Sequence, residues 1–103
     1  MATLKLFWTE TAIRQRNFIF DYWNERNKSN SYSIKLNTKI KERTTLLKIT
    51  PEIGKRTEFK NTYTVSLGHY SIFYQFDSSK VIITAFWDNR QNPRKLLKHL
   101  SKK

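Results

Sequence analysis

The amino-acid sequence predicts an α+β fold: an N-terminal strand, an antiparallel helical hairpin, a three-stranded antiparallel meander and a short basic C-terminal segment. Three patterns carry this prediction. A short run of alternating apolar residues opens the chain, and apolar residues then recur at helical spacing in two successive segments. In the second half, apolar and polar residues alternate within segments that turn signals separate. With 103 residues, the chain is expected to form a single domain over residues 1–103.

The first 27 residues are predicted to form one strand followed by one helix. Apolar side chains alternate in Leu4–Trp8, which is typical of a short strand. Thr9 can cap a helix, and Glu10 suits the positive N-terminal end of that helix. From Glu10 to about Asn27 the apolar residues follow helical spacing, and we expect them to pack in the core: Ala12, Ile19 and Trp23, flanked by Ile13 and Phe20.

A second helix is expected after the polar break at residues 28–31. Ser29 or Ser31 can cap it, and Pro51 ends it. Its apolar face consists of Leu36, Ile40 and Leu47, while lysines and arginines mostly occupy its other faces. A short link between two successive helices predicts an antiparallel hairpin. Residues 51–61 read as a loop with a basic bias.

Three strands are predicted in the second half. Tyr63–Leu67 and Tyr70–Phe76 flank Gly68 and His69, a good signal for a type II′ hairpin. A second tight turn at residues 77–80 leads into Val81–Asp88. Strict alternation then assigns one apolar face for the helices to cover: Tyr63, Val65, Leu67, Tyr70, Ile72, Tyr74, Phe76, Val81, Ile83, Ala85 and Trp87.

The opposite face of the meander is expected to be polar. It carries Thr64, Ser66 and Ser71, together with three large apolar side chains, Phe73, Ile82 and Phe86. Apolar groups among hydroxyls suggest that the C-terminal segment or another protein covers part of this face.

Composition narrows the functional classes. The chain has 20 Lys and Arg against 8 acids, a formal net charge of +12, which favours a polyanionic or acidic partner. The absence of Cys excludes a disulfide framework, a thiolate zinc site and a Cys nucleophile. The two His lack metal-ligand spacing and no Gly-rich phosphate loop is present, so no metal or cofactor is expected. Without a signal-peptide pattern or a span-length apolar run, we expect a cytoplasmic protein with no membrane partner.

The end of the last strand holds the most distinctive motif. Asp88-Asn89-Arg90-Gln91-Asn92-Pro93 follows the strand and resembles the D-x-R-x-x-P ending of one subgroup of the RelE/ParE superfamily of bacterial toxins. Tyr70–Tyr74 is similar to the aromatic-x-aliphatic-x-Tyr strand of that superfamily. The resemblance covers essentially the whole chain and implies the toxin of a type II toxin–antitoxin module, held inactive by a cognate, often acidic, antitoxin.

The same resemblance implies two incompatible activities. RelE-like toxins cut mRNA in the ribosomal A site, whereas ParE-like toxins poison DNA gyrase without being nucleases. Metal-free RNA cleavage needs a proton acceptor, cations and a proton donor. Where RelE-like enzymes place cations, this chain has Thr64, Ser66 and Ser71. The charge of +12 suits a ribosomal site crowded with phosphates and favours mRNA cleavage, with gyrase inhibition or a non-toxic basic binding module as alternatives.

The candidate site residues follow from the chemistry of the residues and from the resemblance to the superfamily. Arg90, Glu58 and Lys60 are the candidates for catalysis; Glu58 lies near the position where one RelE-like branch has a glutamate base. Each also has a plainer interpretation, because Glu58 sits among cations and Asp88 can pair with Arg90 or cap the following turn. The candidates for RNA or partner binding are Lys55, Arg56, His69, Phe73, Phe86 and Arg94.

Overall fold

The computed structural model describes residues 3–91 and has the predicted α+β architecture. Residues 92–103, which include Arg94 and the basic C-terminal segment, lie outside the described residues. The elements are β1 (Lys5–Trp8), α1 (Glu10–Asn27), α2 (Ser31–Ile49), a 3-10 turn η1 (Pro51–Ile53), β2 (Lys55–Arg56), β3 (Tyr63–Leu67), β4 (Tyr70–Phe76) and β5 (Lys80–Asp88). The predicted N-terminal strand, helical hairpin and meander are therefore confirmed.

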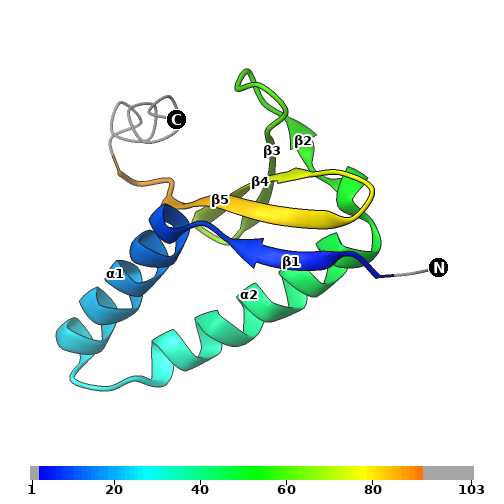
Figure 1. The fold of residues 1–103 in the computed structure, drawn as a ribbon. Helices are drawn as coiled ribbons and strands as arrows, with labels where there is room; N and C mark the ends of the chain where they lie inside the picture. The colour runs from blue at the N-terminus through cyan, green and yellow to red at the C-terminus, as the bar shows by residue number, and fades with distance from the viewer. Residues whose placement is uncertain (1–2, 92–103) are drawn as a thin grey trace.

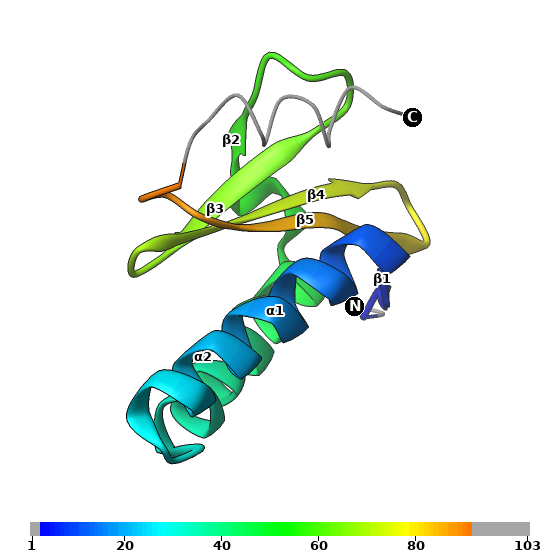
Figure 2. The same cartoon turned by 90° about the vertical axis from the view of Figure 1, so that its left-hand side faces the viewer.

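The strands form one mixed sheet in the order β1-β5-β4-β3-β2. β1 runs parallel to β5, and the other neighbours pair antiparallel. Figure 1 shows β1 at one edge of the sheet and the β2 end rising on the other side. Figure 2, turned by 90°, shows both helices on the same side of the sheet. The N-terminal strand thus closes the sheet beside β5 before the chain enters the helices.

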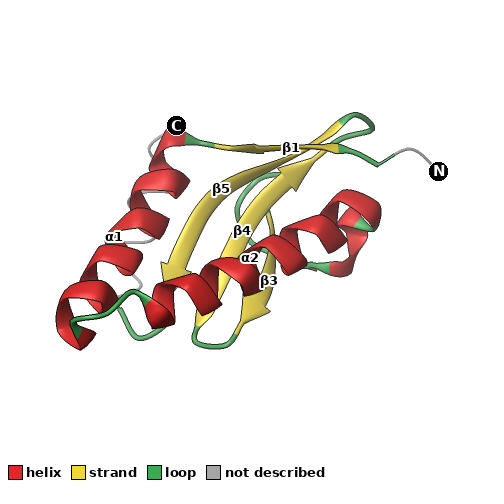
Figure 3. Ribbon diagram, turned by 90° about the horizontal axis from the view of Figure 1, so that it is seen from below, coloured by secondary structure: helices red, strands yellow, loops and turns green. Residues whose placement is uncertain are grey.

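The two helices cover the apolar face of the sheet. Figure 3 shows them diverging from their connecting loop beneath the strands. Thr9 caps α1 as predicted: its hydroxyl accepts a hydrogen bond from Ala12 N at 3.2 Å. The expected stripes are in the core, with Ala12, Ile19, Leu36, Ile40 and Leu47 all buried.

The start of α2 differs from the prediction. Asn30 occupies the N-cap position, and its side chain makes no capping hydrogen bond. Ser29 lies one residue too early and instead accepts from Ser31 N at 3.1 Å. The polar run 28–31 offers several residues with capping chemistry; Lys28, in the left-handed conformation (φ 51°), ends α1, and α2 begins at Ser31.

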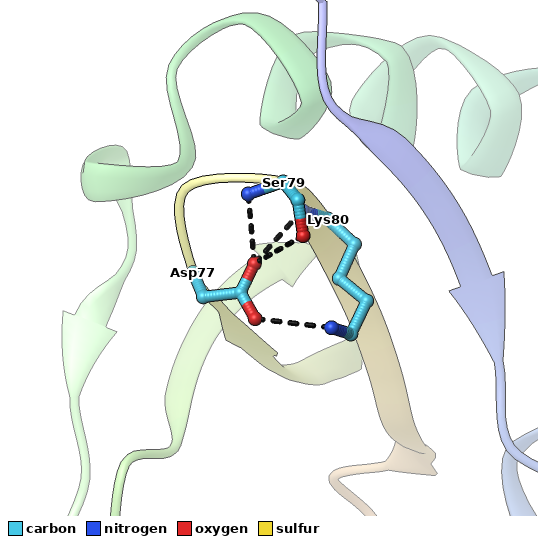
Figure 4. A network of polar contacts seen from close by, with 3 residues as sticks. All are labelled: Asp77, Ser79 and Lys80. Carbon is cyan, nitrogen blue, oxygen red and sulfur yellow. Dashed lines mark hydrogen bonds and ion pairs between the residues drawn. The ribbon is translucent and has the colours of Figure 1, made fainter.

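Two tight turns set the register of the meander. Gly68 has φ 61° and His69 is not among the residues with positive φ, as a type II′ turn requires. In the second turn, Asp77 Oδ1 accepts hydrogen bonds from Ser79 N (2.8 Å), Ser79 Oγ (2.9 Å) and Lys80 N (3.0 Å), and Oδ2 lies 3.1 Å from Lys80 Nζ (Figure 4). These bonds, led by that of the Ser79 backbone, hold the pKa of Asp77 well below its usual value.

A β-bulge in β5 overturns part of the predicted face assignment. Phe73 pairs with Ala85, but Tyr74 pairs with Ile83, so Thr84 is an extra residue. Beyond the bulge the side chains exchange faces. Phe86, predicted on the polar face, is 0% exposed and stacks on Tyr70 in the main core, with ring centroids 5.2 Å apart.

The same bulge moves two predicted core residues outward. Ala85 and Trp87 join Phe73 in a separate cluster on the face away from the helices. Phe73 is 8% exposed and Trp87 6%. Ile72 is fully buried and Ser71 is half-buried on the opposite face, so the predicted register of β4 is confirmed.

Residues 51–61 contain more structure than the loop that was predicted. The 3-10 turn η1 begins at Pro51, and the two residues of β2 pair with Thr64 and Tyr63 of β3. Tyr74 anchors this segment from inside the core, because its hydroxyl donates to Pro51 O (2.6 Å) and accepts from Gly54 N (3.0 Å). Tyr74 thus holds the segment that leads into the extra edge strand.

Candidate functional site

The turn after β5 holds Arg90 in a defined position. The Arg90 guanidinium donates from Nε to Asp88 Oδ1 (2.9 Å) and from Nη2 to Asp88 Oδ2 (2.8 Å). Its backbone N–H also donates to Asp88 Oδ1 at 2.9 Å. Asp88 therefore pairs with Arg90 and caps the turn at once, and this two-pronged, charge-assisted geometry restricts the arginine to one orientation.

Burial and charge compete at Asp88. Its side chain is only 13% exposed, against 48% for that of Arg90. Burial by itself would raise the pKa of Asp88, but the hydrogen bonds and positive charge of Arg90 outweigh it and leave that pKa below its usual value. The carboxylate is thus ionised at neutral pH and keeps the arginine paired.

Aromatic rings surround this ion pair. The guanidinium carbon of Arg90 lies 5.8 Å from the ring centroid of Trp23 and 6.0 Å from that of Tyr70. Tyr32 packs against Trp23 with centroids 5.0 Å apart, and its hydroxyl lies 2.9 Å from that of Tyr70. We call Trp23, Tyr32, Tyr70, Asp88 and Arg90 the arginine–aromatic cluster. In this cluster the guanidinium of Arg90 therefore lies beside the rings of Trp23 and Tyr70.

The cluster opens onto a groove along α1. One hollow of about 450 Å³ is lined by Ile19, Trp23, Arg26 and Arg90 together with Phe18, Tyr22, Asp88 and Gln91. A second hollow of about 310 Å³ continues along α1 past Arg14 and Gln15 and shares Phe18 and Ile19 with the first. Phe18 and Tyr22 are 63% and 48% exposed, so the groove presents aromatic surface to solvent.

This site suits binding better than proton transfer. The pKa of Tyr70 is raised well above its usual value, first by burial and then by its hydrogen bond with Tyr32, so its phenol stays protonated. Asp88 is ionised but committed to Arg90. Among residues 3–91 there is no group of three or more His, Asp or Glu side chains placed to hold a metal ion. Aromatic side chains and arginine, which line this site, are enriched in protein–protein interfaces.

The three candidates for catalysis do not meet. Asn89 N donates to His69 O (2.8 Å), which places Arg90 at the β3–β4 hairpin end of the sheet. Lys60 lies at the other end, where its carbonyl oxygen faces Gln75 Nε2 at 3.5 Å. Because β4 has seven residues, the two ends are roughly 20 Å apart. Glu58 is exposed in the β2–β3 connection beside Lys60, and His69 is exposed at the hairpin tip.

The remaining predicted binding residues are spread over the surface and the core. Lys55 and Arg56 are exposed and form the edge strand β2. Phe73 and Phe86 are both buried: the bulge in β5 places Phe86 under the helices instead of on the predicted polar face, and Phe73 packs with Ala85 and Trp87. Arg94 lies outside the described residues.

The outer face of the sheet keeps the expected hydroxyls. Thr64 and Ser66 pair with Phe73 and Ser71 across β3 and β4. Ser71 Oγ donates to Asn89 Oδ1 at 2.8 Å, which ties this face to the turn that carries Arg90. The bulge adds Trp87 to the same face, so the centre of the outer sheet is occupied by hydroxyls and packed apolar side chains.

Sequence reasoning missed the exposed part of the site. The sequence patterns did not identify Phe18, Tyr22 and Arg26 as site residues. Trp23 packs against the core as predicted, but it is only half-buried and also lines the groove. A signal was present in the spacing: Phe18 and Tyr22 lie four residues apart and off the Ala12–Ile19–Trp23 stripe, between Arg14 and Arg26.

The arrangement of an N-terminal strand, a helical hairpin and an antiparallel meander also occurs in a solved structure. The chain is similar to a chain of the solved structure of the chromosomal ParDE TA system from P. aeruginosa, with a TM-score of 0.69 and 18% identity. That match covers 82% of this chain and 94% of the other. At this identity the match shows a shared fold.

The family is shown by a match at the sequence level. The model of the ParE toxin of the type II toxin–antitoxin system parDE matches residues 6–93. The chain belongs to this ParE toxin family, as the resemblance in its strands and in the Asp88–Pro93 motif implied. No curated protein matches the sequence. None of the described helices combines the length and apolar character needed to cross a membrane.

Proposed function

We propose that this protein is a growth-inhibiting toxin that acts by binding DNA gyrase, and that a cognate acidic antitoxin holds it inactive. Within the toxin class this is the ParE-like activity, which needs a recognition surface and no catalytic groups. On the sequence alone, the net charge of +12 favoured mRNA cleavage. That charge does not separate the two activities, because it attracts both the ribosome with its mRNA and gyrase bound to DNA.

The observation that carries the proposal is the make-up of the outer sheet face. A ribonuclease of the RelE type needs several cations converging on the scissile phosphate, and removing one such stabiliser typically costs about 10²–10³ in rate. Among the described residues, the centre of this face carries Thr64, Ser66 and Ser71 around the packed side chains of Phe73 and Trp87, and the hydroxyl of Thr64 is buried. The cation Lys55 lies opposite Thr64, on the two-residue edge strand β2. A hydroxyl can donate one hydrogen bond to a phosphate but cannot neutralise developing charge.

The positions of the candidates for catalysis support the same proposal. Arg90 is committed to Asp88, while Glu58 and Lys60 lie at the opposite end of the sheet. A scissile phosphate at one end cannot contact both sets, because the separation of roughly 20 Å exceeds the reach of any side chain. By contrast, the arginine–aromatic cluster and its groove form a recognition surface.

Charge supports an acidic antitoxin. All 8 acids of the chain fall between Glu10 and Asp88, and 20 cations outnumber them. An acidic partner would gain in association rate and would neutralise this field. The solved structure with a similar fold is a ParDE toxin–antitoxin system, which fits such a pairing for this chain.

Two assays on the purified protein test the proposal. In the first, gyrase supercoils a relaxed plasmid in the presence of the toxin; in the second, ribosomes hold a defined mRNA. We expect supercoiling to be inhibited and the mRNA to stay intact. Arg90→Ala should weaken the inhibition, whereas Lys41→Ala, which removes an exposed cation from α2, should not. Codon-phased cuts in the mRNA with normal supercoiling would overturn the proposal in favour of cleavage.

A further inference from the structure

A row of three cations lies on one side of α2. Lys35, Lys39 and Arg43 follow one another at intervals of four residues. Residues four apart are neighbours on the surface of a helix and lie about 6 Å apart along its axis, so the row extends over about 12 Å. Lys35 and Lys39 are exposed, and Arg43 is half-buried. The helix therefore presents three positive charges along one line of the surface, which we call the α2 cation row.

The α2 cation row borders a hollow between α2 and the β3–β4 hairpin. This hollow of about 430 Å³ is lined by Lys39, Glu42, Arg43, Leu46, Leu67 and Gly68. The guanidinium of Arg43 donates from Nη1 to Ser66 O at 2.7 Å, which restricts this cation to the edge of the hairpin. A guanidinium has five N–H donors, and this bond uses one of them. Arg43 can therefore hold the hairpin and still donate to a ligand in the hollow.

The charges of the row are not neutralised within the described part of the chain. Each ion pair among residues 3–91 joins cations that lie elsewhere, on α1, at its C-terminal end, in the β4–β5 turn and after β5. Glu42 is the only acid of α2 and lines the same hollow, but within residues 3–91 it forms no ion pair with the row. Three aligned cations beside a single carboxylate leave a positive potential, which attracts a polyanion.

The spacing and the surroundings of the row suit the backbone of a DNA duplex. Each strand of the duplex carries one phosphate per about 3.4 Å of its axis, so about 12 Å of one strand contains three to four phosphates. Three cations in a line can each contact one of them without reading the bases. Single-stranded nucleic acid is bound differently, by stacking of its bases on aromatic rings. Among the described residues no aromatic side chain lines this hollow, which favours a duplex over an unpaired strand.

We propose that the α2 cation row binds the phosphate backbone of duplex DNA, in the segment that gyrase holds when the toxin acts on it. This inference rests on the proposed inhibition of gyrase and adds a contact between the toxin and the DNA of the same complex. A toxin that contacts both components is bound more tightly to gyrase with DNA than to gyrase alone, because the second contact forms within one complex. Arg90 and the row lie on different elements, so substitutions can test the two contacts separately.

Binding of the purified protein to a fluorescently labelled DNA duplex, measured by anisotropy at several salt concentrations, tests the inference. The row variant combines Lys35→Gln with Lys39→Gln. The matched control combines Lys41→Gln with Lys48→Gln, which removes the same charge from the same helix; Lys41 lies about half a turn from Lys39, on the side that Lys48 shares.

The salt dependence reports the number of phosphate contacts. Each contact contributes about −0.9 to the slope of log affinity against log salt concentration. We expect the row variant to flatten this slope by about 1.8, whereas the control stays close to the wild type. A fourfold rise in salt, from about 50 to about 200 mM, should then weaken the wild type about 12-fold more than the row variant. In the supercoiling assay, half-inhibition should need more of the row variant than of the control.

Several results would overturn the inference. Equal slopes for the two double variants would mean that the cations act through net charge alone, and would leave the inhibition of gyrase standing. Tighter binding to a single-stranded RNA of the same length, lost in the row variant, would assign the row to RNA. Equal half-inhibition by the two variants would remove the row from the gyrase complex. If the row binds the duplex but the wild type does not inhibit supercoiling, the proposed function fails, and with it the gyrase-held segment as the ligand.

Discussion

Replacing Gly54 by Ala tests how the segment before β3 is held to the sheet. Gly54 has φ −75° and ψ 162°, an extended conformation that Ala adopts without strain. On backbone grounds alone, the substitution should stabilise the protein by about 0.4–1 kcal/mol, because it reduces the freedom of the unfolded chain.

The contact with Tyr74 reverses the sign of this effect. A Cβ atom at Gly54 would lie 2.9 Å from both Cε1 and Cζ of Tyr74 and closer still to its hydroxyl oxygen. Tyr74 is 0% exposed and bonded to Pro51 O and Gly54 N, so it cannot move aside freely. Overpacking costs about 1–3 kcal/mol, and weakening each hydrogen bond adds about 0.5–1.5 kcal/mol. With both hydrogen bonds weakened and the backbone gain subtracted, we expect a net loss of about 1–6 kcal/mol.

Thermal and urea unfolding of five variants provide the assay: Gly54→Ala and Gly68→Ala, each with and without Tyr74→Phe, and Tyr74→Phe alone. Each kcal/mol lost should lower the melting temperature by roughly 4–8 °C. Gly54→Ala should lose less stability in the Tyr74→Phe background, because that change removes the nearest atom. Gly68→Ala is the control: it has open space but φ 61°, so it should cost about 1–2 kcal/mol, with or without Tyr74→Phe. A higher melting temperature for Gly54→Ala than for the wild type would refute the Gly54–Tyr74 contact.

Three further predictions follow from the fold and the site. Phe86→Ala should cost about 3–5 kcal/mol in urea unfolding, whereas Phe7→Ala, at a 50% exposed position, should stay within about 0.5 kcal/mol; equal effects would contradict the bulge. Thr9→Ala removes the α1 cap and should cost about 1 kcal/mol, so an unchanged melting temperature would count against that cap. The pKa of Asp88 is depressed in the folded protein, so its ionised carboxylate raises the free energy of unfolding. This stabilisation is fully present above the unfolded pKa of about 3.9 and is lost as the pH falls through the lower folded pKa. The stability difference between the wild type and Asp88→Asn should therefore shrink below about pH 4, and a pH-independent difference would exclude this role.

Local patterns predicted the elements and the helical side of the core. The stripe containing Ala12 and Ile19 and the face containing Leu36 and Ile40 are both encoded by periodicity along single segments. The Gly68 hairpin and the Asp77 turn depend on residue types that favour one backbone shape. These features need no knowledge of the rest of the chain, and each was predicted correctly.

Features that depend on contacts between distant segments were not predictable in this way. β5 has apolar side chains on both parities, so its sequence fits an alternating strand with or without the bulge at Thr84. The bulge is supported from outside the strand: Gln15 Oε1 of α1 accepts from Phe86 N at 2.8 Å, and the hydroxyl of Thr9 donates to Thr84 O at 3.4 Å. The residue before β2, Gly54, is likewise bonded to Tyr74, twenty residues further along the chain.

The site was predicted in part for the same reason. Asp88 and Arg90 are two residues apart, and their pairing follows from local chain geometry. Alternation could assign Lys60 to a face of the sheet, but it says nothing about the distance along that sheet to Arg90. Phe18 and Tyr22 were overlooked because aromatic residues in a helix usually pack in a core.

Mapping RNA and DNA breaks in the same induced cells tests the central claim most directly. The protein is expressed without its antitoxin, the 5′ ends of mRNA are sequenced, and DNA breaks covalently linked to gyrase are mapped in parallel, with Arg90→Ala as the comparison. The binding account predicts accumulating gyrase-linked breaks, mRNA ends like those of uninduced cells, and fewer breaks with Arg90→Ala. Codon-phased mRNA ends that disappear in Arg90→Ala, without gyrase-linked breaks, would contradict it.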